Sequence, residues 1–174
     1  MMKRLALIVA VACSFSGMAQ QVTETKQGLR VDPAGDKPTT EVTVYAPNII
    51  RVTKYADGLE ALPAKKSYSV IMTPEKGKGL WSVEGNTLRT ACITVTVDAA
   101  TGEVRFADAD GNALLSEKGA AEVISIASGV DKGKFSIRQD FKLGADEAIY
   151  GLGQRRSPKL NQRGEKVEIW NHNA

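Results

Sequence analysis

Residues 93–106 read ITVTVDAATGEVRF, and this stretch decides the fold. Apolar and polar side chains alternate strictly over residues 93–97, and the alternation resumes at Val104–Phe106. A period of two over such short runs indicates half-buried β-strands rather than helices. The intervening DAATG ends in Gly102, a residue suited to the positive φ of a tight turn. The stretch therefore predicts two strands joined by a turn.

Similar short runs occur on both sides of this stretch. We predict strands at residues 41–45, 50–55, 68–73, 88–97, 113–115, 135–141 and 167–169. Turn residues, among them Pro47-Asn48 and Asp110-Gly111-Asn112, separate several of these runs. After the first 19 residues, a helical turn is expected only within residues 117–126. Strands spaced by about 8 to 12 residues, with turns between them, favour an all-β fold, an antiparallel β-sandwich.

The first 19 residues have the pattern of an export signal. A basic pair, Lys3-Arg4, precedes an apolar run at residues 5–13, and small residues follow near the expected cleavage point. The pattern predicts a signal peptide at residues 1–19, cut before Gln20, and an exported protein, periplasmic or secreted. Because the run is shorter than the ~20 residues that span a bilayer, no transmembrane segment is expected. A minor alternative is a lipoprotein-type site, AVAC, that would place a lipid anchor on Cys13.

The composition after this signal is that of one nearly neutral domain. The 174 residues carry a net charge of +3, which falls to about +1 once Lys3 and Arg4 are removed. No nucleic acid is expected as a partner, because its recognition needs a dense basic surface. Cys92 then has no cysteine partner and, on a predicted apolar strand, is expected to be buried. We predict an irregular N-terminal segment at 20–40 and one β-sandwich domain at 41–174.

The last 25 residues carry the most specific motifs. They contain YGLGQ at 150–154, NQRG at 161–164 and VEIWNHNA at 167–174. From about Val42 to its end, the chain resembles the N-terminal domain of family 31 glycoside hydrolases, the α-glucosidase and α-xylosidase group. The resemblance implies a galactose mutarotase-like β-sandwich ahead of a catalytic (β/α)8 barrel, a retaining α-glycosidase as the parent protein, and an oligo- or polysaccharide as its substrate. The barrel has no room before residue 174, so we expect a chain truncated before its catalytic domain.

No catalytic residue is expected in this chain. Retaining glycosidases use two carboxyl groups about 5 to 5.5 Å apart, and none of the 20 acidic residues stands in a motif that resembles the family's catalytic aspartates. Gly151-Leu152-Gly153 is not a dinucleotide loop, because Arg156 replaces the third glycine of that fingerprint. His172 is the single histidine and lies far from Cys92 in the sequence, so neither a metal site nor a cofactor is expected.

Four residues near the end of the chain are candidate substrate contacts. They are Arg163, Trp170, Asn171 and Asn173. An indole packs on the C–H face of a sugar, amides exchange hydrogen bonds with hydroxyls, and arginine offers a fork of donors. In the family that the chain resembles, the loop after this tryptophan reaches over the barrel mouth, and Asn173 stands where several relatives carry aspartate. The alternatives are a core Trp170 with an irregular loop and, for Arg163, a solvated basic loop.

Two functions of different class follow. The first is the non-catalytic, pocket-shaping N-terminal part of a secreted retaining α-glycoside hydrolase that acts on α-glucosides or α-xylosides. The alternative is a free-standing secreted β-sandwich module that binds carbohydrate without enzymatic activity. A reading frame that continues far beyond residue 174 would support the first, and a true stop codon would support the second.

Overall fold

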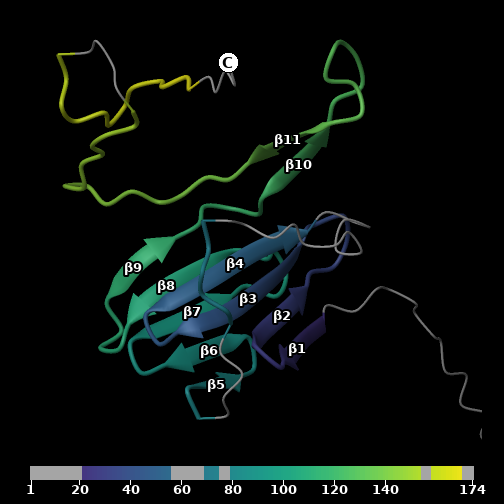
Figure 1. Ribbon diagram of the computed structural model, residues 1–174, viewed down its shortest axis with the longest axis vertical. Coiled ribbons are helices and arrows are strands. Elements are labelled where there is room, and N and C mark those ends of the chain that lie inside the picture. Colours follow the sequence, from purple (N-terminus) through teal and green to yellow (C-terminus); the bar gives the residue numbers. More distant parts are fainter. Residues whose placement is uncertain (1–20, 56–68, 75–78, 154–157, 170–174) are drawn as a thin grey trace, which may run out of the picture. The chain divides into compact units, whose positions relative to one another are not determined.

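The computed structural model describes residues 21–55, 69–74, 79–153 and 158–169. In these ranges the chain forms β-strands, turns and irregular segments, and no helix there is long and apolar enough to cross a membrane. The chain divides into two compact units between residues 141 and 142, and all of the described strands lie in the first unit (Figure 1). The predicted all-β fold is confirmed.

Four antiparallel strands form the first sheet, in the order β1-β2-β3-β4. They are β1 (Gln21–Thr25), β2 (Gly28–Asp32), β3 (Thr39–Ala46) and β4 (Ile49–Tyr55). Alternation fixes the inner face of β3, because Thr40, Val42 and Val44 are fully buried. A β-bulge between Val44 and Ala46 ends the regular pairing just before the turn into β4.

Five antiparallel strands form the second sheet, in the order β5-β6-β7-β8-β9. They are β5 (Trp81–Glu84), β6 (Thr87–Thr90), β7 (Ile93–Val97), β8 (Val104–Asp108) and β9 (Ala113–Ser116). The hairpin predicted from the alternation is confirmed: β7 and β8 pair from Ile93 opposite Asp108 to Val97 opposite Val104. Gly102, in the turn between them, has a φ of 71°, which favours glycine.

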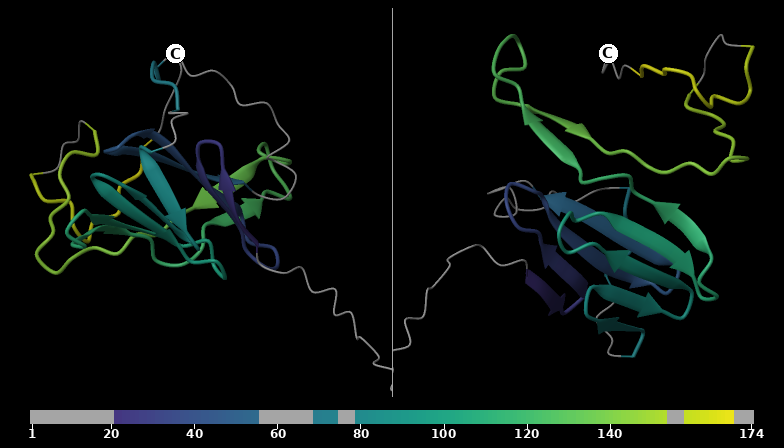
Figure 2. Two further views of the ribbon diagram at one scale, coloured as in Figure 1. Left: turned by 90° about the horizontal axis from the view of Figure 1, so that it is seen from below. Right: turned by 180° about the vertical axis from the view of Figure 1, so that it is seen from behind.

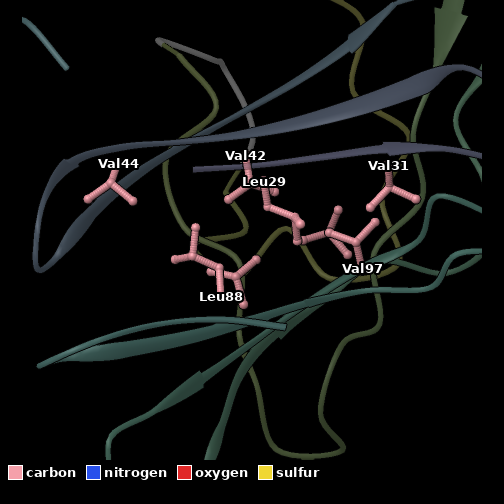
Figure 3. Packing of buried hydrophobic residues seen from close by; sticks show 8 residues of the cluster. Leu29, Val31, Val42, Val44, Leu88 and Val97 are labelled. Carbon is pink, nitrogen blue, oxygen red and sulfur yellow. The ribbon is translucent and has the colours of Figure 1, made fainter. Parts of the chain in front are cut away.

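The two sheets pack face to face on an aliphatic core (Figures 2 and 3). Its fully buried members are Leu29, Val31, Val42 and Val44 from the first sheet and Leu88, Val95, Val97 and Val104 from the second. Gly28 lets β2 lie close to β3, because a Cβ at this position would stand 2.0 Å from the carbonyl oxygen of Val42. Two antiparallel sheets around one apolar layer make the β-sandwich that the sequence predicts.

A two-stranded ribbon follows the second sheet in the chain. It consists of β10 (Glu122–Ser125) and β11 (Phe135–Arg138), which pair antiparallel. An isolated bridge joins Glu117 to Phe141 at its base, and the amide of Lys118 donates to the carbonyl of Asp140 at 2.8 Å. The ribbon occupies part of the segment for which the sequence predicted a helical turn, so that prediction is wrong.

The segment predicted to be irregular, residues 20–40, is largely regular. β1 and β2 form a hairpin between Gln21 and Asp32, and residues 33–38 alone make an irregular connection within the described part of this segment. Leu29 and Val31 alternate in β2 and are fully buried, and the prediction did not use this short alternation. The sandwich therefore begins before residue 41, and the predicted boundary is wrong.

The strand predicted at 88–97 is two strands. The chain turns at Ala91-Cys92, where the Thr90 hydroxyl oxygen accepts hydrogen bonds from the amides of Cys92 and Ile93. A side-chain acceptor of this kind competes with the sheet ladder and ends the strand without a glycine or proline. Cys92 is therefore exposed in a turn, and the prediction that it is buried is wrong.

Three other predicted strands differ from the structure. The described part of 68–73 contains no strand, and Ile71 there is 92% exposed. The strand predicted at 135–141 ends at Arg138, after which Phe141 forms the isolated bridge alone. Residues 167–169 are not a strand. Apolar residues at alternate positions are necessary for a half-buried strand, but without a pairing neighbour they do not form one.

Candidate functional site

The glycine-rich motif near residue 150 forms a left-handed turn. Gly151, Leu152 and Gly153 have φ angles of 86°, 63° and 88°. This region is open to glycine but costs another residue about 1–2 kcal/mol, so Leu152 carries backbone strain in this turn. All three residues are exposed. The motif is a tight turn, and no helix that could make it a nucleotide-binding loop follows in the described residues.

The NQRG motif binds the main chain just before this turn. The side-chain oxygen of Asn161 accepts hydrogen bonds from the amides of Ile149, at 3.1 Å, and Arg163, at 3.0 Å. The amide of Gln162 donates to the carbonyl of Ile149 at 2.7 Å. Gln162 itself is 6% exposed, and its side chain donates to the carbonyl of Lys159. Both polar groups of the Ile149 main chain are therefore bound by residues 161 and 162.

Arg163 extends this contact along the chain. Its Nη1 donates to the carbonyl oxygens of Gly144 and Glu147, each at 2.6 Å. Hydrogen bonds from a cationic donor are stronger than those from a neutral one. The Glu147 carboxylate in turn accepts from the amide of Gly144 at 3.0 Å. We call residues 161–163, with the segment 144–149 that they bind, the arginine clamp.

The structure describes one of the four predicted substrate contacts. Arg163 lies in the arginine clamp, where it binds main-chain carbonyls. Trp170, Asn171 and Asn173 lie outside the described residues, and their contact with sugar stays a prediction. The role of Asn161 was missed, although the spacing of NQRG after YGLG pointed to a link between the two motifs.

A buried ion pair that the residue pattern did not predict lies in the first unit. Lys54 Nζ stands 2.6 Å from Glu117 Oε2, and the two side chains are 14% and 7% exposed. Lys54 also donates to the carbonyl of Gly102 at 2.9 Å, and Glu117 accepts from the amide of Val104 at 2.7 Å. The pair therefore ties β4 of the first sheet to the β7–β8 turn of the second.

Two turn aspartates bind the backbone. The carboxylate of Asp98 accepts hydrogen bonds from the amides of Ala100 and Thr101 in its own turn. The bond from the Thr101 amide is the largest cause that lowers the pKa of Asp98. The Asn112 side-chain amide lowers the pKa of Asp108 in the same way. Both carboxylates stabilise their turns. In the described part of the chain, no group of three or more His, Cys, Asp or Glu side chains is placed to hold a metal ion.

The sandwich and its two C-terminal motifs define a galactose mutarotase-like domain of the kind found in glycoside hydrolases. Residues 39–174 match the family described as the glycosyl hydrolase 31 N-terminal galactose mutarotase-like domain, and the chain belongs to this family. The match confirms the resemblance noted in the sequence. Its start at residue 39 lies three positions before the predicted start at Val42.

A solved structure supports the same assignment. The chain is similar to the crystal structure of a glycoside hydrolase family 31 α-xylosidase from Xanthomonas citri, with a TM-score of 0.69 and 31% sequence identity. The match covers 86% of this chain. It covers 16% of the α-xylosidase chain, so this chain spans about one sixth of that relative's length.

Proposed function

We propose that this chain is the non-catalytic N-terminal part of a secreted retaining α-glycoside hydrolase that acts on α-glucosides or α-xylosides. The observation that carries the proposal is the family match over residues 39–174, together with 31% identity to an α-xylosidase. In this role the domain shapes one side of a sugar pocket, and a catalytic barrel elsewhere in the protein performs the chemistry.

The contacts of three carboxylates in the sandwich support a non-catalytic role. Retaining hydrolysis needs a carboxylate nucleophile and a carboxylic acid/base about 5 to 5.5 Å apart, both facing the substrate. Asp98 and Asp108 instead accept hydrogen bonds from their own turns, and Glu117 is buried against Lys54. Carboxylates engaged in this way are used to hold the fold and do not form a pair that faces a substrate.

The proposed sugar contacts are Trp170, Asn171 and Asn173, with Arg163 as a further candidate. The indole would pack on a sugar ring, and the amides would exchange hydrogen bonds with its hydroxyls. The geometry of Arg163 supports a positioning role, because its Nη1 binds the main chain of residues 144–147. Such a clamp would fix the main chain at residues 161–163, shortly before the proposed contact residues.

The proposal is tested first by an activity assay. The purified chain is expected to give no turnover of aryl α-glucosides or aryl α-xylosides above a buffer blank, because it lacks the carboxylate pair. Turnover that survives further purification would contradict the non-catalytic role. Calorimetric titration with α-linked oligosaccharides separates the alternative, because strong binding by the chain alone would favour a free-standing carbohydrate-binding module.

Export is tested separately. Expressed with its N-terminal residues in a bacterial host, the chain is expected outside the cytoplasm with Gln20 as its first residue. Mass spectrometry of the intact protein shows whether its mass is that of a chain that begins at Gln20. A protein that retains residues 1–19 would contradict export by signal cleavage, and a lipid on Cys13 would favour the lipoprotein alternative.

A further inference from the structure

The β10–β11 ribbon carries an exposed apolar face. Its register places Val123 opposite Ile137 and Ser125 opposite Phe135, and residues that lie directly opposite in an antiparallel pair share a face. Ile137 is 73% exposed and Phe135 is 47% exposed. We call Val123, Phe135 and Ile137 the ribbon face. Three large apolar side chains gathered on one side of two strands are a surface that water solvates poorly.

The opposite side of the ribbon carries charge. Glu122 and Arg138 lie opposite each other there, with their charged atoms 4.0 Å apart. Arg138 also binds the Asp140 carboxylate at 2.7 Å. Ile124 shares this side and is 52% exposed, so the separation is not complete. The ion pairs nevertheless identify this side as the one suited to water and leave the ribbon face as the one suited to a protein contact.

A two-stranded ribbon is marginally stable by itself in water, and it needs a third strand or a packed apolar surface. At its base, the described residues show the bridge between Glu117 and Phe141 and the hydrogen bond from Lys118 to Asp140. The amide of Gly119 also donates to the Glu103 carboxylate, just before β8, at 3.1 Å. These contacts hold the base of the ribbon. They leave Phe135 and Ile137 exposed, so a further contact is needed to cover the ribbon face.

We propose that the ribbon face docks on the part of a family 31 hydrolase chain that follows the N-terminal domain. This inference rests on the proposed function. The length of the similar α-xylosidase is the argument for this occupant. The match covers 16% of that chain, so most of that polypeptide is available to cover surfaces of the domain. The family description also defines the domain as N-terminal, which places further chain after it.

A second copy of this chain fits the ribbon face less well. A stable interface between separate proteins buries about 800 Å² on each partner, which is more than three side chains on a narrow ribbon provide. A neighbour in the same polypeptide needs a smaller contact, because covalent linkage gives it a high effective concentration. The size of the ribbon face therefore favours an intramolecular partner.

The experiment compares the 174-residue chain alone with a chimera in which it replaces the matched part of the Xanthomonas citri α-xylosidase. Cys92→Ser first removes the exposed thiol of the sandwich, and Cys13 stays in every variant and in the baseline. Ile137→Cys then places a thiol on the ribbon face, and Val130→Cys places one between β10 and β11, where the native side chain is 98% exposed. Maleimide labelling rates are measured for both, with the Cys92→Ser parent of each protein as the baseline.

In the chain alone, both thiols are expected to react at similar rates. In the chimera, the thiol of Ile137→Cys is expected to react about tenfold more slowly, the protection given by a contact worth about 1.4 kcal/mol, while Val130→Cys is unchanged. Phe135→Cys serves in the same way if Ile137→Cys does not fold. Equal labelling of the ribbon face in both proteins would overturn the proposal, as would a chimera that forms no soluble protein with a single melting transition.

The same chimera separates docking from the proposed function. Its activity on an aryl α-xyloside reports the sugar pocket, whereas labelling reports the ribbon face. An assembled chimera with a protected ribbon face but no activity would support docking and contradict the pocket-shaping role. An active chimera with an unprotected ribbon face would contradict docking and leave the pocket-shaping role supported.

Discussion

Removing one partner of the buried ion pair is expected to destabilise the sandwich severely. The change is Lys54→Met, which keeps an unbranched side chain of similar length and removes the ammonium group. Glu117, whose side chain is 7% exposed, would then keep the amide of Val104 as its hydrogen-bond donor. A carboxylate left in this position has lost both most of its water and its counter-charge.

The expected magnitude follows from the burial of the pair. Breaking a buried pair by removing one partner costs about 3–5 kcal/mol. The Lys54 side chain is 14% exposed, so some water reaches the site and we expect a somewhat smaller cost, about 2–4 kcal/mol. A domain has about 5–15 kcal/mol of free energy of unfolding in total. The single substitution should therefore remove a large share of the stability.

The double variant Lys54→Met/Glu117→Leu should recover part of the loss. Both charges are gone in this variant, and replacing a buried pair by apolar side chains is often close to neutral. The amide of Val104 loses its acceptor, which costs about 1–3 kcal/mol. The Gly102 carbonyl keeps the hydroxyl of Thr40, at 3.2 Å. We expect the double variant to lose about 2 kcal/mol less unfolding free energy than the sum of the losses in the two single variants.

The assay is urea unfolding followed by far-ultraviolet circular dichroism, with the midpoint and slope compared across variants. Lys134→Met is the matched control, because it breaks an ion pair with Asp131 of the same 2.6 Å length whose side chains are 69% and 52% exposed. Its expected cost is about 0–1 kcal/mol. A loss of less than about 1 kcal/mol for both single changes at the buried pair, or strict additivity in the double variant, would refute the reasoning.

Three further substitutions test other parts of the structure. Gly28→Ala should lower the free energy of unfolding by about 1–3 kcal/mol, because the added Cβ would stand 2.0 Å from a carbonyl oxygen of β3; an unchanged urea midpoint would contradict this. Asn161→Ala should speed hydrogen exchange of the Ile149 amide about fivefold, the loss of a bond worth about 1 kcal/mol, and NMR exchange rates check it. The hydrogen bond from Arg30 lowers the pKa of Asp32 below its ordinary 3.8, so its contribution is present above that pH and lost as the pH falls through the folded pKa. Asp32→Asn should therefore cost about 0.5–1 kcal/mol at neutral pH and flatten the acid limb of the stability curve; identical curves for the two proteins would rule this out.

The parts of the fold that the sequence predicted are those where burial acts on one face at a time. Val95 and Val97 are fully buried in β7, and the threonine between them faces the other way. The two-residue period of the strand is therefore visible in the alternation of apolar and polar residue types. Gly102 marks the following turn for an equally local reason, its positive φ. Nothing distant in the chain is needed to read either feature.

The predictions failed where a single polar contact decides the structure. The break between β6 and β7 depends on the Thr90 hydroxyl, which accepts two amides and also donates to the carbonyl of Pro47 at 2.6 Å. Threonine is a common strand residue, so its presence at this position does not indicate a turn. Similarly, the residues of the buried ion pair, Lys54 and Glu117, are 63 positions apart, and neither stands in a pattern that predicts burial.

The candidate site was predictable in its motifs but not in their roles. Arg163 was identified by its fork of hydrogen-bond donors, which suggested a contact with the sugar substrate. Its partners are the carbonyls of Gly144 and Glu147, and main-chain acceptors leave no signature in residue types. The NQRG sequence is the same whether its arginine binds a ligand or the main chain of a loop, so the sequence cannot distinguish the two roles.

The arginine clamp and the buried ion pair have a common physical design, and this bears on how the motifs should be used. In each, a charged side chain binds carbonyls or amides of a segment that is distant in the chain, as Lys54 does with Gly102 and Arg163 does with Gly144. Residues that hold main chain fix where neighbouring side chains are presented, and they do so identically for any ligand. The NQRG motif is then expected to be common to relatives with different substrates. Differences in sugar specificity should be sought in residues that present side chains to the pocket, beginning with the proposed contacts Trp170 and Asn173.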